Sequence, residues 1–403
     1  MKALALAWHN VLRNRRRSVV TILIATLGTA SMLVAGGFTL YTYDSLREGA
    51  ARDFGHLTVS HPEFFRRDEE MPLQYGMDGH VALKQRLEAH AHVKRVLPRV
   101  NLSGLVSNGE KSMIFMGSGA DIAGEAAMRG QFLTLVSGSM PGAGARVPEV
   151  LLGVDLARGL SAAPGSVLTL LATTSAGAMN GVDVRVTGTV TTGWHDVDQR
   201  LVYLGIDTAQ YLLATDKVST LAVFLDATDA TPAVLAELAS ADPAHGYKPW
   251  WEQAFYYQSV RALYNRIFGL LGIVIALLVF FSVSNTLAMA VVERTREIGT
   301  LRALGALPGE LVAGFVREGA LIGLLGSALG MLLAGAVSLS LRHAGLEMPA
   351  PPGRTVGYPL YVHADPWLYA ACTAAIVALC ACAAWLASRK AARLPIVQAL
   401  AHT

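Results

Sequence analysis

The chain has 403 residues, of which 53% are hydrophobic and 16% are charged, and its mean hydropathy is +0.41. Soluble proteins average about 25% charged residues, so this composition excludes an ordinary soluble domain, a disordered chain and a small disulfide-rich secreted protein. The net charge of +3 joins two unlike parts: residues 44–261 hold 18 Lys and Arg against 24 Asp and Glu, and the remainder holds 15 against 6. Positive charge beside apolar stretches indicates a lipid membrane as partner and no nucleic acid.

Four stretches are long and apolar enough to cross a bilayer as helices, which takes about 20 residues each. They predict an α-helical membrane protein with four transmembrane helices, at residues 18–43, 263–292, 309–341 and 366–388. The alternative for the first stretch is a cleavable signal peptide, but its apolar run is long for one and no clean cleavage site follows it. We therefore expect this helix to be retained.

Lys and Arg gather in the short segments before the first stretch, between the second and third, and after the fourth. Such segments stay on the cytoplasmic side of a membrane, so both ends of the chain and the middle loop are expected inside. The remaining segments are then extracytoplasmic. The expected segments outside the helices are residues 1–17, 44–262, 293–308, 342–365 and 389–403.

The first of these segments carries Leu4, Trp8 and Leu12 at a helical spacing, next to a basic cluster. This pattern favours an interfacial helix that lies in the plane of the membrane surface. The alternative is a simple extension of the first transmembrane helix. The last segment, residues 389–403, is expected to be a cytoplasmic tail.

Residues 44–262 show both strand and helix patterns and predict a large α+β extracytoplasmic domain of two subdomains, with a stalk at 248–266 that extends the second membrane helix. The expected strands are residues 56–60, 112–116, 167–171, 182–192, 201–204 and 220–225. The expected helices are residues 81–90, 154–160, 208–213 and 232–240.

No pattern in the sequence predicts catalysis, a metal site or a bound cofactor. Residues 104–112 nearly match a phosphate-binding loop, but Glu110 displaces the required lysine by one position. His90 and His92 lie two apart and would point to different sides of a helix, so we expect a solvated surface there. Residues 194–198 carry His and Asp but no paired nucleophile, and a loop between strands is expected. The three cysteines, all in the fourth span, are expected to pack as small apolar groups.

Residues 293–308 are the most informative segment. Ile298, Leu301 and Leu304 are spaced three apart and predict one apolar stripe on a short helix, which Gly305 would end and Pro308 would keep from continuing. So short a helix is marginal alone and needs a surface to dock against. The alternative is an ordinary loop with a solvated charged face. The candidate docking residues are Glu293, Arg294, Arg296, Glu297, Ile298, Leu301 and Arg302.

Small residues in the third span predict close helix–helix contact. These are Gly323, Gly326, Gly330 and Gly335, with Ala328 and Ala334. Gly269 and Gly272 suggest the same for the second span. Arg317 and Glu318 at one edge of the third span are expected to form a local pair, with Arg317 reaching toward the membrane surface. The alternative is that they belong to an ion pathway.

The sequence resembles the permease subunits of MacB/FtsX-type ABC transporters, a family that includes the lipoprotein-releasing LolC/LolE proteins. The resemblance is carried, in chain order, by residues 7–18, 149–160, 293–306 and 392–400. It covers essentially the whole chain and agrees with four membrane helices. The chain looks nearest the lipoprotein-releasing branch, because it has no fused ATPase domain and its extracytoplasmic region is long.

The resemblance implies a dimeric, non-catalytic permease of the bacterial inner membrane, with its large domain in the periplasm. The helix in residues 293–308 would rest on a separate cytoplasmic ABC ATPase, which would bind the ATP, so the chain itself would need no cofactor. Further implied partners are a second copy or a homologous permease and a periplasmic partner. ATP-driven motion would release or extrude a lipoprotein, a lipid or another envelope substrate. The alternative is a non-transporting signal transmitter or scaffold that regulates an envelope enzyme.

Overall fold

The computed structural model describes residues 15–67, 69–142, 147–348, 358–393 and 395. It divides into two compact units. The helical unit comprises Met1–Asp44, Val260–Glu347 and Pro359–Thr403, and the sheet unit comprises Ser45–Ser259 and Met348–Tyr358. The interfacial helix expected at residues 1–17 and the end of the tail expected at 389–403 lie outside the described residues.

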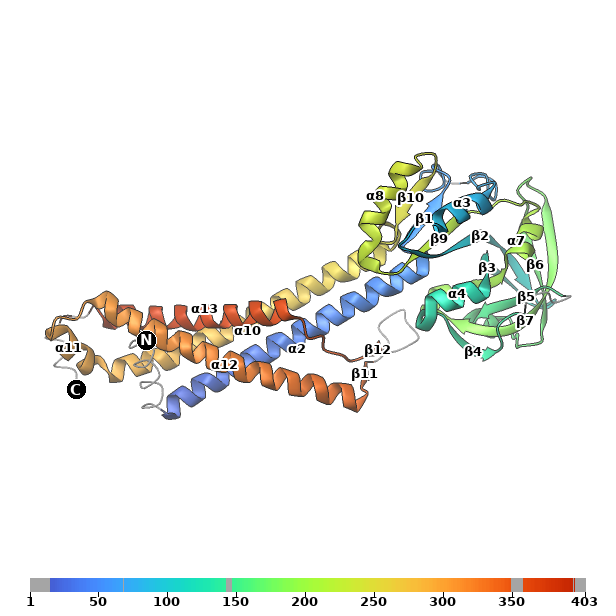
Figure 1. Ribbon diagram of the computed structural model, residues 1–403. Helices are drawn as coiled ribbons and strands as arrows, with labels where there is room; N and C mark the ends of the chain where they lie inside the picture. The colour runs from blue at the N-terminus through green and yellow to red at the C-terminus, as the bar shows by residue number, and fades with distance from the viewer. Residues whose placement is uncertain (1–14, 68, 143–146, 349–357, 394, 396–403) are drawn as a thin grey trace. The chain divides into compact units, whose positions relative to one another are not determined.

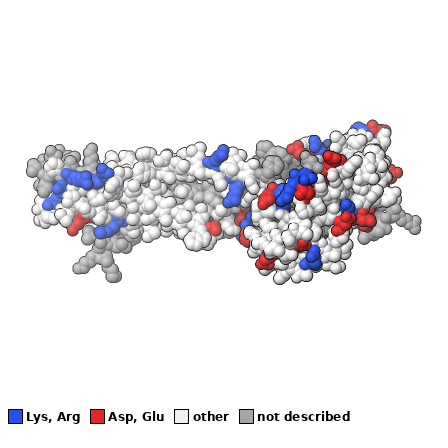
Figure 2. Space-filling model, turned by 90° about the horizontal axis from the view of Figure 1, so that it is seen from above, with Lys and Arg blue, Asp and Glu red and all other residues white. Residues whose placement is uncertain are grey.

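Among the described residues, four helices are long and apolar enough to cross a membrane: α2 (Arg15–Phe54), α10 (Phe255–Glu293), α12 (Pro308–Ala344) and α13 (Pro366–Ala391). They confirm the predicted four-helix membrane class. The short helix α11 (Thr295–Ala303) lies between α10 and α12 in the chain (Figure 1). Lys and Arg gather at the end of the helical unit that carries α11, and a band of uncharged side chains follows (Figure 2).

The helical unit has its own apolar core, to which all four long helices contribute. Ala25 of α2, Val283 of α10, Ile322 of α12 and Ile376 of α13 are buried together in it. Cys380 belongs to the same cluster and Cys372 to a second one, whereas Cys382 is exposed. The small side chains of this cluster, Ala25, Ala383, Ala384 and Cys380, allow the helices to approach closely there.

The sheet unit contains a ten-stranded mixed sheet among its described residues, which confirms the predicted α+β class. Its strands are β1 (Leu57–Ser60), β2 (Val93–Ser107), β3 (Ser112–Ala120), β4 (Thr134–Gly138), β5 (Glu149–Gly153), β6 (Val167–Thr173), β7 (Met179–Thr191), β8 (Leu201–Gly205), β9 (Thr220–Leu225) and β10 (Gly246–Pro249). The order is β10-β1-β9-β2-β3-β8-β5-β7-β4, with β6 paired to β2 and β7. One sheet therefore joins what the sequence suggested were two subdomains.

The helices of the sheet unit are α3 (His80–Glu88), α4 (Ile122–Arg129), α5 (Val154–Gly159), α6 (His195–Asp198), α7 (Ile206–Leu213), α8 (Thr231–Ala241) and α9 (Trp250–Gln253), with single 3₁₀ turns at Gly130–Phe132 and Thr228–Ala230. Two two-residue strands, β11 (Glu347–Met348) and β12 (Tyr358–Pro359), lie between α12 and α13 in the chain.

Buried strands follow from continuous apolar sequence. Every residue of β9 is buried, and β9 lies between β1 and β2 in the sheet. Such a strand reads as an unbroken apolar run instead of an alternating one. Phe115 of β3 and Leu152 of β5 are fully buried in the same unit.

Several elements differ from the prediction. The longest strand, β2, was not expected, because it contains Pro98 and Gly104, which are unusual inside strands. The near-match to a phosphate-binding loop at residues 104–112 therefore begins inside this strand and not in a loop. The loop expected at residues 194–198 contains the one-turn helix α6. The predicted stalk begins too early, because residues 246–249 form β10, which pairs with β1, and α10 begins only at Phe255.

Candidate functional site

The turn between α10 and α12 has a defined hydrogen-bonded geometry. The N–H of Gly305 donates to the carbonyl of Arg302 at 3.0 Å, and the N–H of Ala306 donates to the carbonyl of Leu301 at 3.0 Å. This pair of bonds closes a helix when the residue after the cap is left-handed, and Gly305 has φ +100°. α12 then starts at Pro308, which needs no N–H partner there.

Two ion pairs connect the start of α11 to neighbouring helices. The carboxylate of Glu293 accepts hydrogen bonds from the guanidinium of Arg17 in α2. The Nη1 atom of Arg294 lies 3.4 Å from Oε2 of Glu318 in α12, and both side chains are nearly buried, at 12% and 8% exposed. Glu318 thus has its partner across the turn. These pairs fix the end of α10 against α2 and α12.

The predicted apolar stripe is divided between two environments. Ile298 is only 3% exposed and belongs to the interior, whereas Leu301 is 44% exposed and Leu304 is 81% exposed. Leu307, in the loop before α12, is 64% exposed. We call Leu301, Leu304 and Leu307 the leucine turn. Among the other predicted docking residues, Arg296 and Glu297 are exposed and Arg302 is partly exposed.

The glycines of α12 mark its closest contacts. A Cβ atom at Gly326 would lie 2.4 Å from Cβ of Ala25, and one at Gly330 would lie 2.6 Å from Cβ of Thr29, so α2 approaches here. At Gly323 the same atom would lie 2.9 Å from Cα of Val377 in α13. Only glycine allows helix axes to come this near.

Three other glycines differ from the expectation. A Cβ atom at Gly335, Gly269 or Gly272 would meet no described atom within 4 Å. These positions therefore do not form close helix contacts within the described part of the chain. Sequence alone could not separate the two sets, since spacing does not show which face of a helix has a neighbour.

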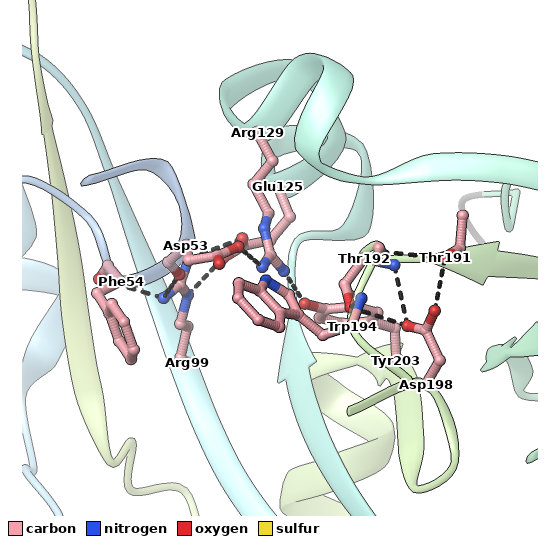
Figure 3. A network of polar contacts seen from close by, with 11 residues as sticks. Asp53, Phe54, Arg99, Glu125, Arg129, Thr191, Thr192, Trp194, Asp198 and Tyr203 are labelled. Atoms are coloured by element: carbon pink, nitrogen blue, oxygen red, sulfur yellow. Dashed lines mark hydrogen bonds and ion pairs between the residues drawn. The ribbon is translucent and has the colours of Figure 1, made fainter. Parts of the chain in front are cut away.

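A second polar cluster lies in the sheet unit around the end of α2 (Figure 3). Arg99 of β2 donates from Nε and Nη2 to the two carboxylate oxygens of Glu125, at 2.6 and 2.8 Å, and from Nη1 to the carbonyls of Asp53 and Phe54 at 2.9 and 3.2 Å. Arg129 of α4 donates to the Asp53 carboxylate and to the hydroxyl of Tyr203. Arg99 therefore satisfies two of the carbonyls that a helix leaves free at its end.

Because this cluster is buried, its charged groups need well-placed partners. Glu125 is 1% exposed, and a buried carboxylate is tolerated only with a well-placed partner such as the fork of a guanidinium. Burial also raises the pKa of the Tyr203 phenol, which keeps this hydroxyl neutral. The sequence analysis missed the cluster, because its members lie on four separate elements and no spacing connects them.

The His and Asp residues at 194–198 have structural roles. The carboxylate of Asp198, fully buried, accepts hydrogen bonds from the hydroxyls of Thr191 and Thr192 and from the Thr192 N–H at 2.9 Å. Nδ1 of His195 lies 2.7 Å from Oδ2 of Asp155. A small pocket beside Trp194 is lined by Ser45, Leu46, Gly49, Asp53, Phe132 and Thr192.

The predicted histidine surface is also partnered. Nε2 of His90 lies 2.9 Å from the carboxylate of Glu237, and Nδ1 of His92 lies 3.2 Å from that of Asp226. Across the described residues, no group of three or more His, Cys, Asp or Glu side chains is arranged to hold a metal ion.

Both units match known protein families. Residues 18–241 match the model of the MacB-like periplasmic core domain, and residues 269–396 match the model of the FtsX-like permease C-terminal region. The lipoprotein-releasing system transmembrane protein LolC of Neisseria meningitidis serogroup B is 32% identical over 194 residues, which are 46% of each chain. The macrolide export ATP-binding/permease protein MacB of Salmonella choleraesuis is 36% identical over 138 residues, 34% of this chain and 19% of that protein.

The aligned region thus spans about half the length of the LolC relative and less of MacB. The crystal structure of the periplasmic region of MacB from Actinobacillus actinomycetemcomitans is 15% identical and covers 52% of this chain and 95% of its own, with a TM-score of 0.35. The family assignment rests on the two family models, which follow one another along most of the sequence. The chain belongs to the FtsX-like ABC transporter permeases that carry a MacB-like periplasmic core domain.

Proposed function

We propose that this chain is the permease subunit of a bacterial inner-membrane complex in which a separate ATPase docks on the leucine turn. The observation that carries the proposal is the exposure of Leu301, Leu304 and Leu307 beside charged Arg296 and Glu297. Apolar side chains presented together on a polar end of a molecule mark a contact with another protein. In this proposal the turn faces the cytoplasm and the sheet unit faces the periplasm.

The ion pairs of the turn give docking a mechanical consequence. A partner that shifts α11 also pulls on α2 through Arg17 and on α12 through Glu318. α2 is a single helix from Arg15 to Phe54, and its last residues are held by Arg99 in the sheet unit. We propose that ATP-driven displacement of the turn is passed along this helix to the sheet unit.

The names of the relatives indicate only the general class of cargo. One relative is named for lipoprotein release and another for macrolide export. We propose release or extrusion of a lipoprotein, a lipid or another envelope substrate. In this proposal hydrolysis of ATP is assigned to the partner.

The test replaces the exposed leucines by charge. Leu301→Asp with Leu304→Asp should abolish recovery of ATPase activity with the tagged permease from native membranes, because a charge in an apolar contact is costly. Leu346→Asp is the matched control, since Leu346 is 51% exposed but lies beyond the other end of α12. Ile298 is unsuitable for this test, because its burial would confound docking with folding. Unchanged ATPase recovery and turnover in the double variant would reject the assignment.

A second measurement addresses the cargo. Proteoliposomes that contain the permease and its copurified ATPase should hydrolyse ATP faster when a triacylated lipoprotein is supplied. Absence of stimulation, with intact ATPase binding, would argue against lipoprotein as the substrate and for a signalling role.

A further inference from the structure

The helix α13 carries an exposed tryptophan near each of its ends. Trp367 is 84% exposed and Trp385 is 43% exposed. They are separated by five complete turns at 100° per residue, so both indoles leave the helix in the same direction, about 27 Å apart along its axis. The opposite side of α13 is buried in the helical unit, where Ile376 and Cys380 are fully enclosed. We call the side that carries both indoles the tryptophan face.

Only small apolar side chains lie between the two indoles on this face. The residues within about 40° of their direction are Ala371, Ala374, Ala378 and Ala381, of which the first three are exposed and the last is partly exposed. Arg389 follows one turn beyond Trp385, and its guanidinium carbon lies 4.9 Å from the centre of the indole ring. The tryptophan face is therefore an apolar strip with an indole at each end and a positive charge just beyond one of them.

The level of Trp367 can be followed onto the neighbouring helices. A Cβ atom at Gly36 of α2 would lie 2.9 Å from Cδ1 of Leu368, the next residue of α13. The Ser338 hydroxyl of α12 donates to the carbonyl of Val362, just before α13, at 3.1 Å. A plane through Trp367 and across the helical unit thus crosses α2 near Gly36 and α12 near Ser338.

The level of Trp385 is marked by a second close contact. A Cβ atom at Gly319 of α12 would lie 2.7 Å from Cβ of Ala384. The stretch of α12 from Gly319 to Ser338 rises by about 28 Å, which agrees with the separation of the two indoles along α13. Two helices that run in opposite directions therefore give the same distance between the two planes.

The charged residues of these helices lie outside the two planes. Ala25 of α2 lies against Gly326 of α12, so counting back along both helices brings the Trp385 plane to Ser18 of α2. Arg17 and Glu318 are then the first charged residues beyond this plane. The enclosed segments, which contain no Lys, Arg, Asp or Glu, are residues 18–36 of α2, 319–338 of α12 and 367–385 of α13.

We infer that lipid covers the tryptophan face of α13, with Trp367 and Trp385 in the headgroup regions of the two leaflets. The planes are about as far apart as a hydrocarbon core is thick, and an indole prefers the boundary between hydrocarbon and water. Arg389 can reach lipid phosphate from its place beside Trp385. A second protein helix along the alanines would meet a bulky indole at both ends, whereas acyl chains pack around such side chains.

This position in the membrane has a consequence for α2. The predicted first span ends at residue 43, but the Trp367 plane crosses α2 near Gly36. Residues 37–43 then lie beyond the hydrocarbon core, although most of them are apolar or aromatic. The inference requires only that the helical unit is in a membrane, so it can fail while the docking of an ATPase on the leucine turn is confirmed, and the reverse.

The first experiment measures what covers the alanines, in the full-length chain reconstituted in liposomes. Nitroxide labels are attached to Ala374→Cys or Ala378→Cys after Cys372, Cys380 and Cys382 have been replaced by alanine. Both labels should collide freely with oxygen, which dissolves in hydrocarbon, and rarely with a water-soluble nickel complex. A label at Tyr361→Cys, which lies before α13, should show the reverse. Few collisions with either reagent at both alanines would show that protein covers the face, and frequent collisions with nickel would show water; either result would overturn the inference.

The second experiment tests the two indoles and keeps the native cysteines. Liposomes are prepared with lipids brominated either near the headgroup or near the end of the acyl chain, and quenching of tryptophan fluorescence is measured. Trp367→Phe with Trp385→Phe should lower the quenching by bromine near the headgroup. Trp251→Phe, on α9 of the sheet unit, is the matched control and should leave this quenching unchanged. Full quenching in the double variant, or a larger loss for bromine near the chain end, would contradict the proposal.

Discussion

Arg99 connects the end of a long helix to the core of a sheet. It satisfies two helix-terminal carbonyls and a buried carboxylate with a single guanidinium. Lysine has the same charge but lacks the planar fork that this geometry uses. The role of Arg99 is therefore geometric as well as electrostatic.

Removing Arg99 should destabilise the sheet unit strongly. Arg99→Met leaves Glu125 buried without its partner, which should cost about 3–5 kcal/mol of unfolding free energy. Adding Glu125→Leu should recover part of this loss, because both charges are then absent. Denaturant unfolding of the purified chain and of these variants measures each free energy of unfolding. Arg95→Met on the same strand is the control: its partner Asp121 is 46% exposed, so the loss should stay below about 1 kcal/mol. A double variant less stable than Arg99→Met would contradict this account.

His56 should make stability depend on pH. Nδ1 of this buried ring accepts from the Leu225 N–H at 3.2 Å, and Nε2 donates to the Thr228 hydroxyl, which donates to Glu48. Burial lowers the pKa of His56 to about 4, so the folded state holds the neutral ring while the unfolded chain takes up a proton below about pH 6.5. The contribution of neutral His56 to the free energy of unfolding is complete above pH 6.5. It decreases as the pH falls from 6.5 to 4, by at most about 3 kcal/mol.

Thermal unfolding across that pH range would measure the His56 contribution. His56→Gln keeps a donor near Thr228 and cannot titrate, so its curve should be flatter than that of the unsubstituted chain. Curves of equal slope would show that other groups carry the pH dependence.

The long helices α12 and α10 differ in how much of their apolar sequence is buried: 33% of the apolar window of α12, but only 11% of that of α10. A methyl group at Gly330 would meet Thr29 and the Thr26 carbonyl, at 2.6 and 2.9 Å, and the helix backbone cannot yield cheaply. In α10, by contrast, few residues of the apolar window are buried. The same class of apolar helix thus serves as a packed element in one place and as an available surface in the other.

Gly330→Ala should separate α12 from α2. We expect a loss of about 1–3 kcal/mol from overpacking, read as a lower melting temperature in detergent. Gly335→Ala is the control, because its added methyl meets no described atom; higher helix propensity should leave stability equal or raise it by up to about 1 kcal/mol. Equal melting temperatures for the two variants would show that α2 does not approach α12 closely.

At the scale of the whole chain, charge predicts which side of the membrane each unit faces. Cysteines at exposed positions allow the orientation of each unit to be measured. Suitable positions are Val167, on β6 of the sheet unit, and Gly309, at the start of α12. A membrane-impermeant maleimide should label Val167→Cys in intact spheroplasts and Gly309→Cys only after lysis, because the basic segments stay inside. The reverse labelling pattern would invert the proposed topology and place the leucine turn away from any cytoplasmic ATPase.

The amino-acid sequence by itself determined the features that depend on local pattern. Four apolar stretches predict four membrane helices, Gly305 and Pro308 predict the turn, and the run at residues 220–225 predicts the strand β9. In each case the cause lies within one stretch of chain: its length in the bilayer, a left-handed φ, or the absence of polar side chains.

Tertiary structure alone decided what depends on a neighbour. It showed that Ile298 is buried while Leu304 is exposed, that Gly330 meets α2 while Gly335 meets nothing described, and that Arg99 reaches Glu125. Spacing shows that residues share a face, but whether that face is covered depends on segments distant in the chain, and burial and pairing energies arise only when those segments meet.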